Sequence, residues 1–170
     1  MKRFLALVGF IAVFPFFVSR RSRVVRSIWV NAKPAEVFPL INNLKLWSQW
    51  TAWSRREAAE ELYEGPEAGE GALQHWKTER MEGTIRIIQS VPDQRVAYDL
   101  NMENGRHHME GVLTLEPVGE GTRIVWACWW IGIENPYARY MDLAMRWWIR
   151  RDFEAGLENL KQIAEQTARV

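Results

Sequence analysis

A long amphipathic helix near the C-terminus constrains the fold of this chain more than any other feature. Asn135 suits an N-cap and Pro136 a first helical residue, so the helix is predicted to begin there and to run to about Ala168. Apolar residues recur along it every three or four positions, at Met145, Ile149, Phe153, Leu157, Leu160 and Ala164. Gly156 in mid-helix predicts a close approach to whatever packs there. Such a face needs a large apolar partner.

Short segments typical of β-strands fill most of the chain before this helix. They are Val24–Asn31, Glu61–Glu64, Ala72–Glu79, Thr84–Val91, Arg95–Met102, Arg106–Glu116 and Thr122–Ile131. Turn-forming pairs such as Pro92-Asp93 and Asn104-Gly105 separate the later ones, and connections this short favour antiparallel pairing. Two short helical segments, 34–43 and 44–53, follow the first strand. We therefore predict an α+β fold in which a curved seven-stranded antiparallel sheet wraps around the long C-terminal helix.

Five sequence segments in this order resemble the SRPBCC superfamily, and in particular its START-like, polyketide cyclase/dehydrase-like branch. The segments are Pro34–Phe38, Trp47–Trp53, Tyr63–Ala72, Gly121–Trp126 and Asp152–Lys161. The resemblance implies a helix-grip fold with a hydrophobic cavity between sheet and helix, which relatives use for lipids, isoprenoids, polyketides and plant hormones. It does not imply a reaction, because the superfamily has no universal catalytic residues.

Alternation along the strands predicts which side chains would line such a cavity, since successive strand residues point to opposite faces. We expect the lining to be Gln74, Trp76, Tyr98, Leu100, His107, Met109, Leu113, Ile124, Trp126, Trp130, Met145 and Ile149. This surface is mostly apolar, with Gln74, Tyr98 and His107 available for polar contacts, as an apolar ligand with one polar group would need. The alternative is that the same rings simply fill the core.

Three tryptophans spaced three residues apart, Trp47, Trp50 and Trp53, are predicted to cover the open end of the sheet. They either form the mouth of the cavity or only pack against it. The later pair Trp147 and Trp148 flanks the apolar stripe of the long helix. These two rings either extend the core or lie at a lipid interface, where tryptophan is favoured.

The chain contains no recognisable catalytic motif. His107 and Asp142 are weak candidates for an acid/base pair in a dehydration or cyclisation, provided that both face the cavity. Asp142 could equally be a solvated residue near a helix N-terminus. His107 and His108 are strand neighbours that point to opposite faces, so no metal site is predicted. The single cysteine, Cys128, excludes an intrachain disulfide and is expected to be buried and unreactive. We predict no cofactor.

The N-terminus is directed to a membrane. An uninterrupted apolar run of residues 4–18 lies between Lys2-Arg3 and a second basic cluster at 20–23. As a helix it would rise about 22 Å against a hydrocarbon core of about 30 Å, so a span is marginal. An uncleaved anchor is favoured over a signal peptide or a segment lying on the surface. We therefore divide the chain into an anchor, 1–23, and a helix-grip domain, 24–170, expected on the cytoplasmic side.

Charge excludes one class of partner. Residues 1–26 carry six basic side chains and no acidic one, which leaves 16 basic against 21 acidic residues, a net charge of −5, for the rest. A body of this sign lacks the clustered cations that bind nucleic acid.

Three functions remain open after this exclusion. The favoured one is a membrane-tethered binder or carrier of a lipid-, isoprenoid- or polyketide-like molecule. The alternatives are a polyketide cyclase/dehydratase-type enzyme and a partner-binding domain whose core is filled.

Overall fold

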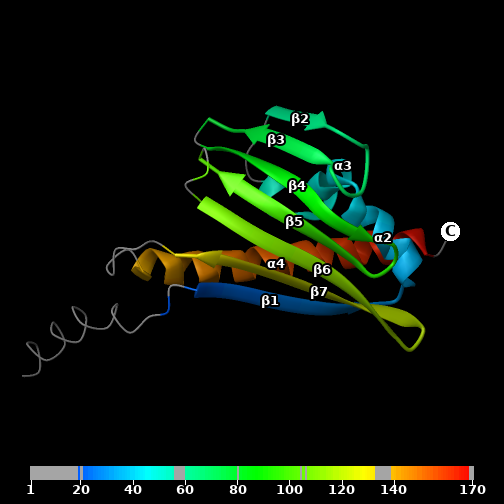
Figure 1. Cartoon of the computed structure of the whole chain (residues 1–170). Coiled ribbons are helices and arrows are strands. Elements are labelled where there is room, and N and C mark those ends of the chain that lie inside the picture. The colour runs from blue at the N-terminus through cyan, green and yellow to red at the C-terminus, as the bar shows by residue number, and fades with distance from the viewer. Residues whose placement is uncertain are drawn as a thin grey trace, which may run out of the picture.

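In the computed structural model, a seven-stranded antiparallel sheet wraps around one long helix (Figure 1). The structure describes residues 19, 21–55, 60–79, 81–103, 105, 107–132 and 139–168. The sheet order is β1-β7-β6-β5-β4-β3-β2. The strands are β1 (Arg21–Val30), β2 (Glu60–Glu64), β3 (Leu73–Lys77), β4 (Glu82–Val91), β5 (Arg95–Met102), β6 (His107–Val118) and β7 (Gly121–Ile131). The α+β architecture predicted from the sequence is confirmed, and the ends of the predicted strands differ from the observed ones by at most three residues.

The helices are α2 (Pro34–Asn42), α3 (Leu44–Trp50) and α4 (Arg139–Thr167). The second predicted helical segment is split, because α3 ends at Trp50 and a short 3-10 turn, Trp53–Arg55, follows it. Thr51 stops α3 by turning its N–H and its hydroxyl back to the carbonyl oxygen of Trp47. The predicted start of the long helix at Asn135 lies outside the described residues.

The core lies between the concave face of the sheet and α4. Phe153, Leu157, Leu160 and Ala164 of the predicted stripe are buried, and Met145 and Ile149 are partly buried against them. The short helices α2 and α3 pack on the C-terminal half of α4, where Asn159 Nδ2 donates to the carbonyl oxygen of Trp50 at 3.0 Å. The N-terminal half of α4 lies at the opposite end of the sheet, beside the start of β1 (Figure 1).

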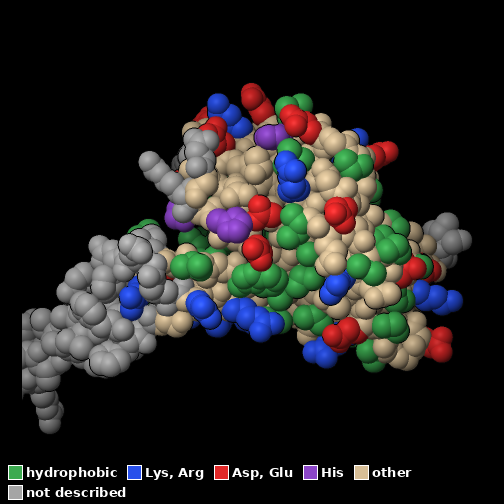
Figure 2. Space-filling view, in the orientation of Figure 1, with side chains coloured by type: hydrophobic (Ala, Val, Ile, Leu, Met, Phe, Trp, Pro, Cys, Tyr) green, Lys and Arg blue, Asp and Glu red, His purple; other side chains and the backbone are tan. Residues whose placement is uncertain are grey.

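The outer face of the sheet carries a mixture of charged, polar and apolar side chains (Figure 2). Cations of β1 lie along its lower edge in this view. The apolar run of residues 4–18 lies outside the described residues. Of the helices that the structure describes, none combines the length and the apolar character needed to cross a membrane.

Candidate ligand-binding site on the concave face of the sheet

Cross-strand pairing arranges the inward side chains in rows across the concave face. The row nearest the start of β6 contains Trp76, Gly83, Met102 and His107. The next row contains Gln74, Ile85, Leu100, Met109 and Trp130, and the third contains Ile87, Tyr98, Gly111 and Cys128. Because antiparallel partners stand on the same face, this register brings the predicted strand residues onto one continuous surface.

Solvent exposure of the inward side chains decreases from the row nearest the start of β6 toward the third row. Trp76, Leu100, Met102 and His107 are partly exposed, whereas Met109 and Trp130 retain only 7% of their surface and the deeper positions are sealed. At the end of the sheet where β6 begins, the apolar inner surface is therefore accessible.

Helix α4 contributes two further apolar side chains to this end. Trp130 Nε1 donates to Asp142 Oδ1 at 3.5 Å, and the Phe153 ring stacks on Trp126 with centroids 3.8 Å apart. Met145 and Ile149 lie between Asp142 and Phe153 on the same stripe, so they face the sheet between those two contacts. Both are partly exposed. We call the partly exposed inward residues Trp76, Leu100, Met102, His107, Met145 and Ile149 the rim.

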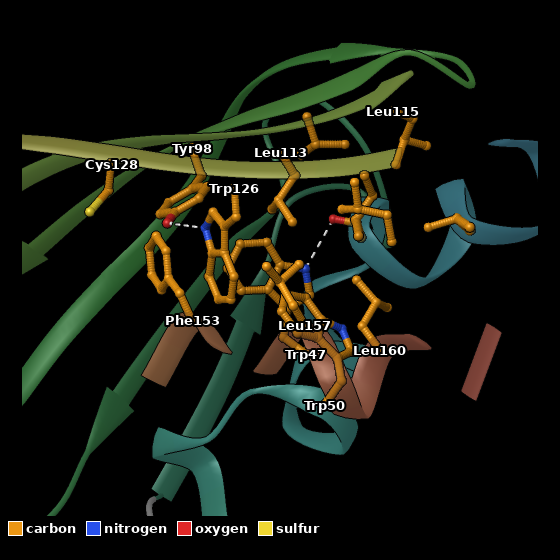
Figure 3. Close-up of a cluster of buried hydrophobic side chains, with 14 of the residues drawn as sticks. Trp47, Trp50, Tyr98, Leu113, Leu115, Trp126, Cys128, Phe153, Leu157 and Leu160 are labelled. Atoms are coloured by element: carbon orange, nitrogen blue, oxygen red, sulfur yellow. Dashed lines mark hydrogen bonds between the residues drawn. The ribbon is translucent and has the colours of Figure 1, made fainter. Parts of the chain in front are cut away.

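The centre of the concave face is filled by aromatic rings (Figure 3). Trp126 Nε1 donates to the Tyr98 hydroxyl at 2.9 Å, and this bond is completely enclosed. Trp50 meets the Trp126 ring edge-on at 5.2 Å, and Trp47 meets Tyr98 in the same way at 5.1 Å. Tyr98, Leu113, Ile124 and Trp126 from the predicted lining thus lie in packed core, while the partly exposed members of that list lie at the rim.

The three spaced tryptophans occupy different environments. Trp47 and Trp50 are buried, and their indole N–H groups donate to the carbonyl oxygens of Ile41 and Leu40. These contacts favour the packing interpretation for both rings. Trp53 is partly exposed and meets Trp126 at 5.6 Å, so a role at the mouth stays a prediction for Trp53.

One polar chain reaches the concave face from the edge strand β2. The buried Gln74 amide donates to the Tyr63 hydroxyl at 3.3 Å, and that hydroxyl donates to Glu61 Oε2 at 2.6 Å. Burial raises the pKa of Tyr63, and the hydrogen bond to Glu61 adds to the shift, so the phenol stays protonated. Tyr63 is absent from the lining predicted above, although alternation along Glu60–Glu64 and the pairing of Tyr63 with Gln74 could have identified it.

The two candidate acid/base residues do not form a pair. His107 Nε2 lies 3.8 Å from Glu103 Oε2 and remains partly exposed. Asp142 is 3% exposed, and its Oδ2 has no hydrogen-bond partner within the described part of the chain. Each has its own neighbour, and no hydrogen bond or ion pair joins these two described residues.

Nucleophilic and metal chemistry find little support in the part of the chain that the structure describes. Burial raises the pKa of the Cys128 thiol to about 12, so at neutral pH it is protonated and a poor nucleophile. No group of three or more His, Cys, Asp or Glu side chains among those residues is arranged to hold a metal ion.

A hollow of about 570 Å³ lies along β2 to β5 and shares Trp76 with the rim. Leu62, His75, Thr84 and Asn101 line it from four paired strands, and Glu60, Lys77 and Glu82 add charge around them. Because Trp76 and Leu62 contribute apolar surface beside these polar and charged groups, the hollow is mixed in character.

Comparison with known proteins agrees with this geometry. A family model described as "Polyketide cyclase / dehydrase and lipid transport" matches residues 21–165. A search of curated protein sequences found no match.

Solved structures share the fold at low sequence identity. Protein MLL2253 from Mesorhizobium loti superposes with a TM-score of 0.63 at 13% identity, covering 86% of this chain and 98% of that one. A Rhodobacter sphaeroides protein gives 0.60 at 21%, covering 84% and 91%. The Aha1 dimer from Colwellia psychrerythraea gives 0.57 at 13%, covering 85% and 96%. These likenesses concern the fold alone. With the family match over most of its length, the chain belongs to the polyketide cyclase/dehydrase and lipid transport family within the SRPBCC superfamily.

Proposed function

We propose that this protein is a membrane-tethered binding or carrier domain for a hydrophobic small molecule, which enters between sheet and helix at the rim. The observation that carries this proposal is the partial exposure of the rim's apolar side chains, next to a buried aromatic core. Apolar side chains left accessible on a concave surface are typical of sites for apolar ligands. The family description, which includes lipid transport, supports the same class of ligand.

The polar residues near the rim would orient such a molecule. Gln74 lies one row deeper than Trp76 and has one N–H bonded to Tyr63, so its amide can offer further hydrogen bonds to a ligand headgroup. His107 stands at the opposite side of the rim. An apolar body with one polar end would match this arrangement.

An enzymatic role of the cyclase or dehydratase type is the second candidate. It is favoured by one observation, the buried Asp142 carboxylate with an oxygen that has no partner among the described residues. Without a paired base at His107 this carboxylate would act alone, which makes binding the better supported function. The third candidate, a partner-binding domain, is favoured by the filled aromatic centre.

Native mass spectrometry of the full chain released from detergent, followed by organic extraction, tests the proposal. We expect a stoichiometric apolar molecule that is lost in Leu100→Lys, because a cation on the rim would have to be desolvated. Asn101→Lys is the matched control, since the neighbouring residue on β5 faces the outer side. A ligand-free mass for the wild-type chain, with no thermal shift from a panel of lipids and polyketides, would instead support the partner-binding domain.

A further inference from the structure

The first half of α4 exposes large apolar side chains on the side away from the sheet. Tyr140, Met141, Trp147 and Trp148 retain 37%, 66%, 51% and 55% of their surface. At about 100° per residue these four positions gather opposite the buried stripe that contains Phe153. The two indoles meet edge to face, with centroids 5.6 Å apart. So many exposed aromatic and apolar groups on one helix face mark an interaction surface.

The charges around these four residues are mostly basic. Arg150 and Arg151 are exposed in the same half of the helix, and the Arg151 guanidinium lies 4.9 Å from the centroid of the Trp147 ring. Exposed acidic side chains, Glu154 and Glu158, begin only further along α4. A surface of tryptophan and arginine complements the headgroup layer of an anionic bilayer, where the rings sit at the interface and the cations meet phosphate.

This surface is joined directly to the point where the apolar N-terminal run ends. Arg146, the residue before Trp147, donates from Nε to the Ser22 hydroxyl at 3.1 Å and from Nη2 to the carbonyl oxygen of Ser19 at 3.3 Å. Ser19 follows residues 4–18 directly in the sequence. A membrane segment there would therefore deliver Trp147 and Trp148 to the bilayer surface.

We propose that the outward face of the first half of α4, formed by Tyr140, Met141, Trp147, Trp148 and Arg151, lies on the surface of an anionic lipid bilayer. The inference rests on the membrane tethering in the proposed function. It adds an orientation, with α4 lying along the membrane. Met145 and Ile149 belong to the same half of the helix, so the rim is held near the lipid and an apolar molecule would cross little water on its way in.

Site-specific fluorescence on the full chain tests this orientation. In a Cys128→Ala background, the environment-sensitive dye NBD is attached at Met141→Cys or, as a matched control, at Gln162→Cys, an exposed position on the same side of α4 in its second half. Each protein is reconstituted with vesicles of phosphatidylcholine and phosphatidylglycerol. The readouts are co-flotation with the vesicles, the emission maximum, and quenching by nitroxide-labelled phosphatidylcholine.

We expect the dye at position 141 to shift to the blue and to be quenched by the labelled lipid, and the dye at 162 to show neither effect. Arg150→Gln/Arg151→Gln should reduce the quenching at 141, whereas Glu158→Gln should not. A blue shift at 141 without lipid quenching would mean that protein covers this face, either the N-terminal segment or a second copy, and would overturn the proposal. Flotation without quenching would contradict the orientation and leave the tether intact, while failure to float would contradict both.

Discussion

At the scale of single residues, two glycines determine how aromatic rings lie on the concave face. Tyr98 stands directly opposite Gly111, and a Cβ atom on that glycine would overlap the phenol ring. Trp76 stands opposite Gly83, where a Cβ would lie 2.6 Å from Cζ2 of the indole. Each ring therefore lies across its neighbouring strand in the space that a side chain would occupy.

Gly111→Ala is expected to destabilise the protein by roughly 1–3 kcal/mol, the usual cost of overpacking a core, because the buried Tyr98 ring has no free space to move into. Urea denaturation measures the effect. In a Tyr98→Leu background the same change should cost much less, since the ring has gone. An equal cost in both backgrounds would show that the strain lies elsewhere.

The buried thiol and phenol predict a loss of stability at alkaline pH. Burial raises the pKa of Cys128 from 9.0 to about 12 and raises that of Tyr98 still further. Between pH 9 and 12 the unfolded chain loses the thiol proton while the folded chain keeps it, so the free energy of unfolding falls as the pH rises. Below pH 9 the thiol is protonated in both the folded and the unfolded state, so it no longer makes the free energy of unfolding depend on pH.

Chemical denaturation at several pH values from 8 to 11 checks this linkage. We expect the decline to be shallower in Cys128→Ala, which has no thiol to titrate. In the native wild-type protein iodoacetamide should modify Cys128 only slowly at neutral pH. Rapid modification without unfolding would contradict the burial of this side chain.

At the scale of elements, the two halves of α4 differ in how tightly they pack. Its second half is held by α3 and the aromatic centre, and Gly156 marks a close approach, because a Cβ there would lie 3.1 Å from Cζ3 of Trp126 and 3.6 Å from the carbonyl oxygen of Trp50. The close approach predicted from this mid-helix glycine is confirmed. The first half packs less tightly, since Met145 and Ile149 are only partly buried.

Gly156→Ala would raise the helix propensity of α4 but would also place a Cβ atom against the Trp126 ring. Alanine would stabilise a free helix by about 1 kcal/mol, but Trp126 is fully buried and stacked on Phe153, so it cannot move aside. We expect a net loss of stability in thermal unfolding. Ala155→Gly at the adjacent exposed position measures the propensity alone. If Gly156→Ala raised the stability in thermal unfolding by as much as Ala155→Gly lowered it, there would be no steric conflict at position 156.

At the scale of the whole molecule, the helix-grip domain should be separable from its N-terminal run. All seven strands and α4 begin after Ser19, and the described contacts of Ser19 and Ser22 are with Arg21 and Arg146 inside the domain. A chain starting at Ser19 is expected to be soluble and to keep the near-UV circular dichroism of the full chain. The full chain should stay with membranes in alkaline carbonate. Aggregation of the shortened chain would mean that residues 1–18 are part of the fold.

The division of the candidate site between core and rim could not be predicted from the sequence. Alternation placed Ile124 and Trp126 on the inner face together with Trp76 and Leu100, since inward and outward positions follow from strand geometry alone. It could not distinguish the sealed pair from the exposed pair. That difference depends on how far each position lies from α3 and from the second half of α4, which cover Trp126 and leave the rim partly open.

The local patterns of the sequence were sufficient for the architecture of this protein. The two-residue period of the strands, the turn residues between them and the stripe on α4 each reflect the burial of one face, so each could be interpreted without its partners. The tertiary structure alone decided that Trp126 is locked by Phe153, Tyr98 and Trp50, that His107 and Asp142 take separate neighbours, and that Arg146 binds the start of β1 beside two exposed tryptophans. Most of these contacts join residues distant in the chain, and all of them depend on side-chain rotamers and cross-strand register that local periodicity does not encode.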